Sequence, residues 1–307
     1  MKKWIRELPI PISGVMLSIA ALGNLYQQNS QEIHLLCGIL TGILFIVLTM
    51  KFICYPKQLK EALQQPEPAS VLVTYTMTWM LLSVYLKPVL HNVSFYIWIL
   101  GGVAHLFLVV RFTIHYVFKV HWRTVFATYY IGYAGIATIG ITAPAYQMEK
   151  VGAASVWVAL VCVGFMLFFV TYRYLRYPDM KESDKLLFCV YASPISVCLT
   201  GYLNSVRPIE YPLLLFLFLA AQFLCGMSFL QAFSHLRGTF YVSFSAFTFP
   251  FVISAMGAQK MMQYLDSLGQ HSLLLKMLVD TEKVVALFLV VYTLIRFINY
   301  MRTETRY

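Results

Sequence analysis

Residues 243–257 have the sequence SFSAFTFPFVISAMG. The segment is apolar enough to lie in a lipid bilayer, but it combines a central proline with serine and threonine hydroxyls and large aromatic rings. A helix that faced only lipid would gain nothing from this mixture, because a proline inside a membrane helix frees backbone groups that its neighbours must satisfy. We therefore predict that the segment lines a pathway through the membrane and that Phe249 blocks this pathway.

The composition predicts an all-α polytopic membrane protein. Of the 307 residues, 60% are hydrophobic and 12% are charged, whereas soluble domains contain about 25% charged residues. Runs such as 156–170, 213–224 and 284–295 contain no charged residue at all. Because a membrane-spanning helix needs about 20 mostly apolar residues, runs of this kind are predicted to be spans.

Ten apolar runs are predicted to cross the membrane. Each is close to the length of about 17–25 residues that a membrane helix needs, or slightly longer, as tilted helices are. They cover approximately residues 9–26, 33–54, 70–87, 93–118, 126–146, 152–175, 186–203, 211–235, 241–264 and 274–300.

The basic residues predict the orientation of the chain. The net charge of +10 comes from lysines and arginines in short loops and at the ends of runs, which argues against nucleic-acid binding. The amino terminus, the loops after even-numbered runs and the carboxyl-terminal tail hold most of these residues. Cytoplasmic loops of membrane proteins are enriched in Lys and Arg, so both termini are predicted to be cytoplasmic.

The ten runs are of two alternating kinds. The even-numbered runs are long and rich in bulky aliphatic residues and phenylalanine, whereas the odd-numbered runs are shorter and rich in small residues. Most odd-numbered runs also contain proline: Pro11 with Gly14 nearby, Pro144, Pro194 and Pro250. The odd-numbered runs begin approximately every 55–60 residues, a period that indicates an internal repeat.

This repeat predicts one transmembrane domain, residues 1–307, made of five tandem helical hairpins. Small residues let helices approach closely, and proline bends them. We therefore predict an inner ring of five kinked odd-numbered helices around a pore and an outer ring of five even-numbered helices. Ordinary packing of kinked helices without a lumen is the alternative. The hairpins cover approximately residues 9–54, 70–118, 126–175, 186–235 and 241–300.

The acidic residues narrow the class of solute. All 13, Glu282 among them, are assigned to loops or to the ends of runs, and no odd-numbered run has one in its middle. Proton relays and cation sites normally contain a carboxylate inside the membrane. The pattern therefore argues against a cation pump and favours an anion or a neutral solute.

Three basic or titratable residues occur in the fourth run: His105, Arg111 and His115. Arg111 and His115 are four residues apart, so they share one face of a helix near its cytoplasmic end. One interpretation is a vestibule, formed by all three, that attracts anions. The other is that Arg111 and His115 extend to lipid headgroups while His105 is a satisfied packing residue.

No pattern of catalytic residues is present. The sequence contains no GxSxG, HExxH or P-loop motif, and its six cysteines do not form a cluster with metal-ligand spacing. We therefore predict a protein that is not an enzyme and that has no catalytic residue, metal or cofactor.

Three motifs resemble a known family. They are PIPISG at 9–14, GIATIGITAPA at 135–145 and FTFP at 247–250, in a chain of ten runs arranged as hairpins. This pattern, over about residues 9–300, resembles the tellurite-resistance/dicarboxylate transporter family, which includes the bacterial protein TehA and the plant slow anion channels. The resemblance implies a homotrimer with one pore in each subunit, small anions as substrates, and Phe249 as the residue that blocks the pore.

The leading functional hypothesis is an anion channel, or a channel-like transporter, in the inner membrane of a bacterium. Its pore would be lined by serine, threonine and backbone groups freed at Pro11, Pro194 and Pro250, because weak contacts let an anion both enter and leave. The alternatives are a proton-linked carrier for malate-like carboxylates, an exporter of sulfite- or tellurite-type oxyanions, and a scaffold whose pore is vestigial.

Overall fold

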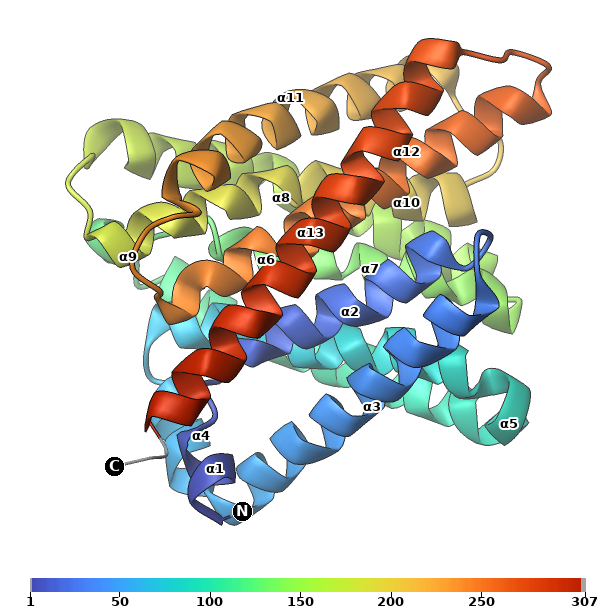
Figure 1. The fold of residues 1–307 in the computed structure, drawn as a ribbon. Helices are drawn as coiled ribbons and strands as arrows, with labels where there is room; N and C mark the ends of the chain where they lie inside the picture. Colours follow the sequence, from blue (N-terminus) through green and yellow to red (C-terminus); the bar gives the residue numbers. More distant parts are fainter. Residues whose placement is uncertain (1, 305–307) are drawn as a thin grey trace.

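The computed structural model describes residues 2–304, and the regular elements of this part of the chain are all helices, without a strand (Figure 1). Five helices are long: α3 (Gln31–Cys54), α5 (Pro66–Phe112), α8 (Glu149–Arg176), α11 (Tyr211–His235) and α13 (Leu273–Glu304). Eight are shorter: α1 (Lys2–Glu7), α2 (Ile12–Tyr26), α4 (Pro56–Ala62), α6 (Tyr129–Gly135), α7 (Ala137–Thr142), α9 (Glu182–Lys185), α10 (Pro194–Ser205) and α12 (Phe249–Ser267). Tighter or wider turns form η1 (Thr113–Val117), η2 (Trp122–Thr124), η3 (Ala143–Tyr146), η4 (Leu186–Ala192) and η5 (Val242–Phe247). The prediction of an all-helical chain is thus confirmed.

Seven helical segments of the described chain are long and apolar enough to cross a membrane. The difference from the ten predicted runs has physical causes. The third and fourth predicted runs lie in one continuous segment, α5 with η1, and the first lies in the 15-residue helix α2. The fifth run is divided among α6, α7 and η3. The chain is therefore polytopic, and the count of ten crossings stays a prediction.

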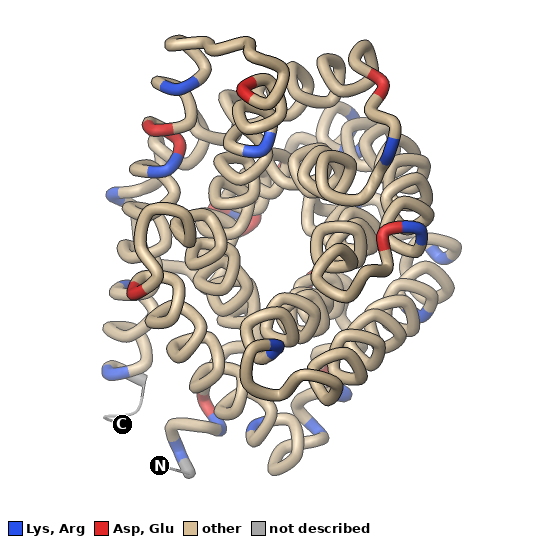
Figure 2. Tube along the Cα trace, turned by 90° about the vertical axis from the view of Figure 1, so that its right-hand side faces the viewer, with Lys and Arg blue, Asp and Glu red and all other residues tan. Residues whose placement is uncertain are grey.

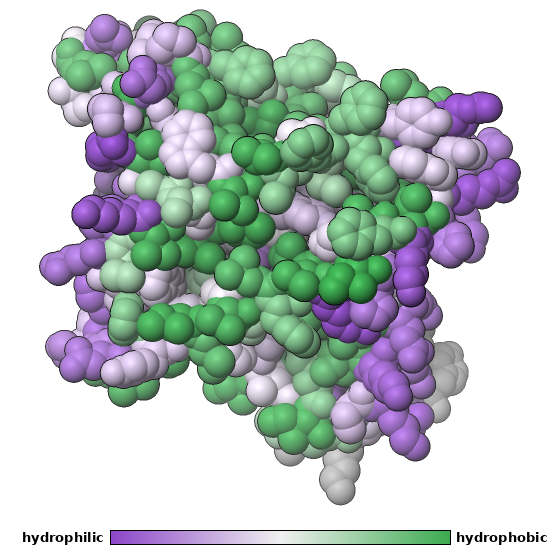
Figure 3. All heavy atoms as spheres, turned by 180° about the vertical axis from the view of Figure 1, so that it is seen from behind, coloured by the Kyte–Doolittle hydropathy of each residue, from purple (hydrophilic) through white to green (hydrophobic). Residues whose placement is uncertain are grey.

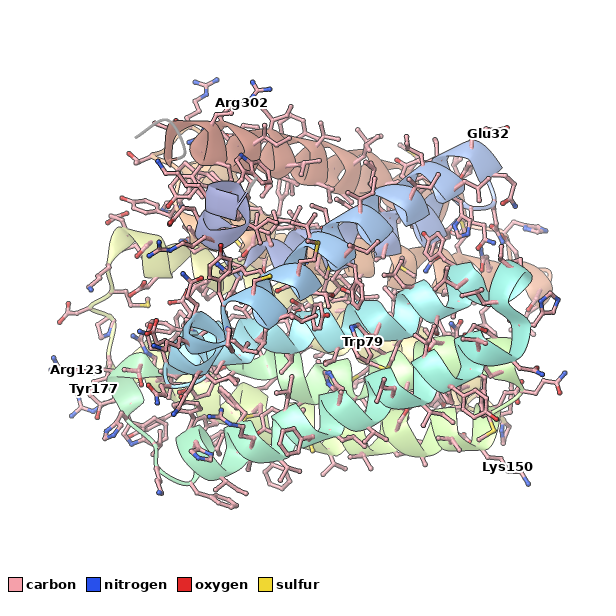
Figure 4. All side chains as sticks on the ribbon, turned by 90° about the horizontal axis from the view of Figure 1, so that it is seen from below. Glu32, Trp79, Arg123, Lys150, Tyr177 and Arg302 are labelled. Atoms are coloured by element: carbon pink, nitrogen blue, oxygen red, sulfur yellow. The ribbon has the colours of Figure 1, made fainter. Side chains whose placement is uncertain are left out.

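Helix α5 reverses direction at His91, which has φ 38° and ψ −109°. This backbone conformation is strained for any residue other than glycine. The two arms of α5 that result pack against each other, as Figure 4 shows beside the labelled Trp79. A Cβ atom on Gly101 of the second arm would lie 2.9 Å from Cβ of Trp79 on the first arm. Glycine is thus required at 101 by the close approach of the two arms.

Prolines of the odd-numbered runs begin helices and do not bend them in their middle. Pro194 is the first residue of α10, Pro250 lies in the first turn of α12, and Pro144 lies in the first turn of η3. Pro11 precedes the first residue of α2. A helix tolerates proline best in its first turn, where the missing N–H group has no intrahelical partner anyway.

The expectation of five kinked helices needs a correction. The first arm of α5 has Pro66 and Pro68 at its start and Pro88 near its end, and it runs without a break to His91. The other odd-numbered runs are interrupted, as at Thr248 (φ −107°, ψ −86°) between η5 and α12 and at Ser193 between η4 and α10. These breaks lie at the point where a proline starts the next helix.

Burial separates two groups of helices. In the most apolar windows of the segments Glu182–Ser205 and Val242–Ser267, 89% of residues are buried, against 17–33% in α3, α5, α8, α11 and α13. Helix α2 is also buried along nearly its whole length. The exposed side chains of the second group are large and apolar. Figure 3 shows one result, an apolar band across the molecule with hydrophilic residues at its two ends.

The buried helices contact one another in a closed cycle. Contacts join α2 to α5, α5 to α6, α6 and α7 to α10, α10 to α12, and α12 back to α2. Helices α3, α8, α11 and α13 pack on the outside of α2, of α6 and α7, of η4 and α10, and of α12, respectively. Figure 2 shows this grouping of helices around a central axis. Helix α1 contacts α13, so both ends of the described chain lie at one end of the molecule (Figure 1).

Candidate functional site

A small cavity lies at the centre of the cycle of buried helices. Its free volume is about 30 Å³, which is room for about one or two water molecules. Each of the five buried elements contributes to its wall. The lining residues are Gly14, Val71, Thr74, Met77, Thr128, Ile131, Ala134, Leu187, Val190, Ser193, Val197, Ser245, Ala246, Phe249 and Pro250.

Phe249 is the one aromatic residue in this lining, as far as the described residues go. It is the first residue of α12 and is 8% exposed. Thr248 fixes the start of the helix, because its hydroxyl donates to the backbone oxygen of Ser245 (2.7 Å). The neighbouring aromatic residues point elsewhere: Phe244 and Phe247 pack on each other with ring centres 4.8 Å apart. Of the aromatic rings in residues 243–257, the ring of Phe249 is thus the one placed at the cavity.

The wall of the cavity is neutral. It contains hydroxyl groups and aliphatic side chains, and no charged residue of the described chain contributes to it. Thr74 donates to the backbone oxygen of Val71 (2.8 Å) and lies 2.7 Å from the hydroxyl of Ser13. The hydroxyl of Thr128 is buried and has no hydrogen-bond partner among the described residues. An anion in this cavity would meet the dipoles of hydroxyl groups but no fixed positive charge.

The predicted pore-lining residues are distributed over different places. Gly14 and Pro250 line the central cavity. Pro194 is buried and follows Ser193, which lines the cavity, whereas Pro11 precedes α2 and is outside the lining. Pro144 borders a different cavity, at the opposite end of the molecule from the termini.

His105 is a packing residue in this structure. It is fully buried, and its Nε2 atom donates to the backbone oxygen of Gly132 (2.9 Å) while Nδ1 lies 2.9 Å from the hydroxyl of Thr76. A Cβ atom on Gly135 would lie 2.5 Å from the imidazole ring. His105 therefore links the two arms of α5 to α6, and it does not line the central cavity.

Arg111 lies at the end of the second arm of α5, and His115 lies in the following turn η1. Nη1 of Arg111 donates to the backbone oxygen of Leu63 (3.1 Å), an atom that also accepts from Tyr116. The ring of His115 is exposed and contacts the backbone oxygen of Arg111 (2.8 Å). Neither side chain lines the central cavity, so the structure does not bring His105, Arg111 and His115 together as a vestibule.

A buried carboxyl group, that of Glu282, is not among the predicted site residues. Glu282 lies inside α13, and its Oε2 atom is buried without a hydrogen-bond partner among the described residues. The side chains of Gln222 from α11 and Ser254 from α12 lie beside it. The spacing of Leu278, Glu282 and Val285 places them on one face of the helix, and only the structure shows that this face lines a cavity of about 220 Å³.

The chain matches the family model SLAC1, described as voltage-dependent anion channel, over residues 7–302. This match confirms the family resemblance of the three sequence motifs. No curated protein matched the chain.

Proposed function

The chain belongs to the SLAC1 family of voltage-dependent anion channels, and from this premise we propose that small anions cross the membrane through the centre of its buried helices. The elements α2, the first arm of α5, α6 with α7, η4 with α10, and η5 with α12 form the inner ring. The second arm of α5 and the helices α3, α8, α11 and α13 form the outer ring. The chain thus crosses the membrane ten times, as five hairpins.

The observation that carries this proposal is the central cavity, to which all five inner elements contribute and in which Phe249 is the aromatic residue. With about 30 Å³ of free volume, the cavity is too small for an anion with its hydration shell. The described conformation is therefore closed, and the ring of Phe249 is the block.

The neutral wall suits conduction. An ion that meets a strong countercharge inside a pore leaves slowly, whereas weak contacts at several sites let it enter and leave. Hydroxyl groups such as those of Thr128 and Ser245 can donate to an anion and hold it only weakly. Movement of the Phe249 ring away from the axis would join the cavity to both ends of the pathway.

Assembly and orientation follow the family resemblance. We place both termini in the cytoplasm, because the basic residues of the termini and even-numbered loops then obey the positive-inside rule. The membrane is the inner membrane of a bacterium, and the assembly is a homotrimer in which each subunit has its own pathway.

Anion flux through purified protein in liposomes tests the proposal. The same protein is then placed in planar bilayers. Chloride, nitrate, sulfite and malate are supplied in turn on one side, and the currents that they carry are compared. We expect electrodiffusive current for at least one of these anions once Phe249 is truncated. A protein without current for any of them, even with Phe249 replaced by alanine, would be the scaffold and not a channel.

A proton-linked carrier is the second candidate, because one observation favours it: the buried carboxyl group of Glu282. A buried carboxyl group inside a membrane segment is a common element of proton relays. Glu282 lies outside the central lining, however, and approaches α12 through Ser254. Saturable uptake of malate that follows an imposed pH gradient, and that is lost in Glu282→Gln, would favour the carrier over the channel.

A further inference from the structure

We propose that Arg207 and Lys260 form an anion-binding site at the mouth of the pathway opposite the chain termini. The inference rests on the proposed function, since it assigns the step at which anions are selected by charge. It starts from a second cavity of about 380 Å³, lined by residues that include Pro144, Asn204, Arg207, Lys260 and Gln263.

This cavity lies along the same helices as the central one. Val197 of α10 and Phe249 of α12 line the central cavity, whereas Arg207, just after α10, and Lys260 of α12 line the second. Ten or eleven residues separate the members of each pair, which corresponds to about 15 Å of helix. The second cavity is therefore placed about 15 Å further along the proposed pathway, at its end.

The second cavity has two cationic side chains and no acidic residue in its described lining. Neither Arg207 nor Lys260 takes part in any ion pair of the described chain. Nη1 of Arg207 donates to the backbone oxygens of Leu203 (3.1 Å) and Val206 (2.6 Å). These two bonds hold the guanidinium group at the cavity and leave its other N–H groups for a ligand.

Lys260 differs from the buried cations Lys51, Arg173 and Lys283 of the described chain, each of which donates to an oxygen atom. Nζ of Lys51 donates to the backbone oxygen of Arg6 (2.6 Å), and Nη1 of Arg173 donates to that of Tyr177 (2.9 Å). Lys260 is half-buried, yet no hydrogen bond joins its ammonium group to any described residue. A half-buried ammonium group that faces a cavity without a partner is a ready contact for an anion.

The remaining polar side chains of the cavity hold its shape. Asn204 donates to the backbone oxygen of Ile141 (3.0 Å), and Gln263 donates to Oε1 of Gln28 (2.8 Å). These bonds tie α10 to α7 and α12 to the end of α2. The ligand class is a small inorganic anion, which two fixed cations concentrate at the mouth before it enters the neutral interior.

Binding is tested first, without any need for conduction. The chloride NMR line width is measured with the purified wild-type protein, with Arg207→Gln/Lys260→Gln and with Lys150→Gln. Lys150 is an exposed lysine at the same end of the molecule, outside the cavity, and serves as the matched control (Figure 4). We expect line broadening for the wild type and for Lys150→Gln, and its loss in the double variant.

The conservative variant Lys260→Arg keeps the charge and is expected to keep the broadening, which separates loss of charge from a disturbed fold. Equal broadening in the double variant and the control would overturn the site and leave the proposed function intact.

Flux then tests the role of the site. In a Phe249→Ala background at low salt, we expect the double variant to reduce chloride current by about threefold or more relative to Lys150→Gln, and the difference to shrink at high salt as charges are screened. Equal currents at low salt would refute the role in anion supply. Broadening that depends on Arg207 and Lys260, in a protein that conducts in no variant, would instead refute the channel and keep the site.

Discussion

Replacement of Phe249 by alanine should open the central pathway. The ring borders a cavity with about 30 Å³ of free volume, roughly the volume of one water molecule in the liquid. Removal of the ring adds space for several more waters, so that hydroxyl groups of the wall become accessible to a hydrated anion. We expect flux to rise by at least about tenfold, which corresponds to a barrier lowered by about 1.4 kcal/mol.

Phe247→Ala is the matched control for this experiment. Phe247 belongs to the same segment, is fully buried and packs on Phe244, but it does not line the cavity. A Phe→Ala change in a packed core costs about 3–5 kcal/mol of folding stability. Phe249 already borders free space, so its loss should cost less. Phe247→Ala should therefore lose more folding stability than Phe249→Ala, whereas Phe249→Ala should gain more flux.

The assay is chloride efflux from liposomes that contain equal amounts of each variant, with melting temperatures measured on the same samples. Phe249→Trp keeps a ring in place and should stay as closed as the wild type. A flux in Phe249→Ala equal to that of the wild type would refute the proposal that Phe249 blocks the pathway. An equal rise in Phe247→Ala would show that any loosening of the segment opens the protein, and would refute it as well.

Three further substitutions test individual contacts. Gly135→Ala should destabilise the protein by about 1–3 kcal/mol, because the new Cβ would lie 2.5 Å from the ring of His105; an unchanged melting temperature would contradict this packing. His91→Gly should stabilise the protein by about 1 kcal/mol, since glycine adopts φ 38° without strain, and thermal unfolding beside His91→Ala, which keeps the strain, measures the difference. Glu282→Gln should leave chloride current unchanged in a channel, because Glu282 is outside the central lining; a large loss of current would place the carboxyl group in the transport pathway.

The family and the two kinds of helix could be predicted from the sequence because each depends on local composition. Proline and small residues in the odd-numbered runs indicate helices that are surrounded by others, and the structure buries α2, α10 and α12 accordingly. Bulky aliphatic residues in the even-numbered runs indicate contact with lipid. The family match over residues 7–302 confirms the family resemblance that was predicted from the sequence motifs.

The helix breaks could be predicted only in part. Proline indicates that a helix changes at that point, but whether it bends a helix or starts one depends on the backbone before it. Thr248 ends η5, and α12 then begins with Pro250 in its first turn. The reversal at His91 lies between the predicted runs 70–87 and 93–118, three residues after Pro88, but nothing in the sequence marks His91 as a turning residue inside one continuous helix.

The charged sites depend on distant parts of the chain and could not be predicted from spacing. Arg207 and Lys260 are 53 residues apart in sequence and meet at one cavity because α10 and α12 are neighbours in the ring. Glu282 belongs to an apolar helix whose inward face becomes evident only when α11 and α12 are in place. Helical spacing shows which residues share a face, but not which face is covered.

The oxygen partners of the buried cations have a consequence for behaviour in acid. Lys51 and Arg173 donate to backbone oxygens, which do not titrate. An ion pair with a carboxylate weakens as the pH falls through the pKa of that carboxylate, whereas a bond to a backbone oxygen persists as long as the cation keeps its proton. These anchors should thus hold in acidic solution, so that a fall in transport at low pH would report on the pathway and not on a loosened scaffold.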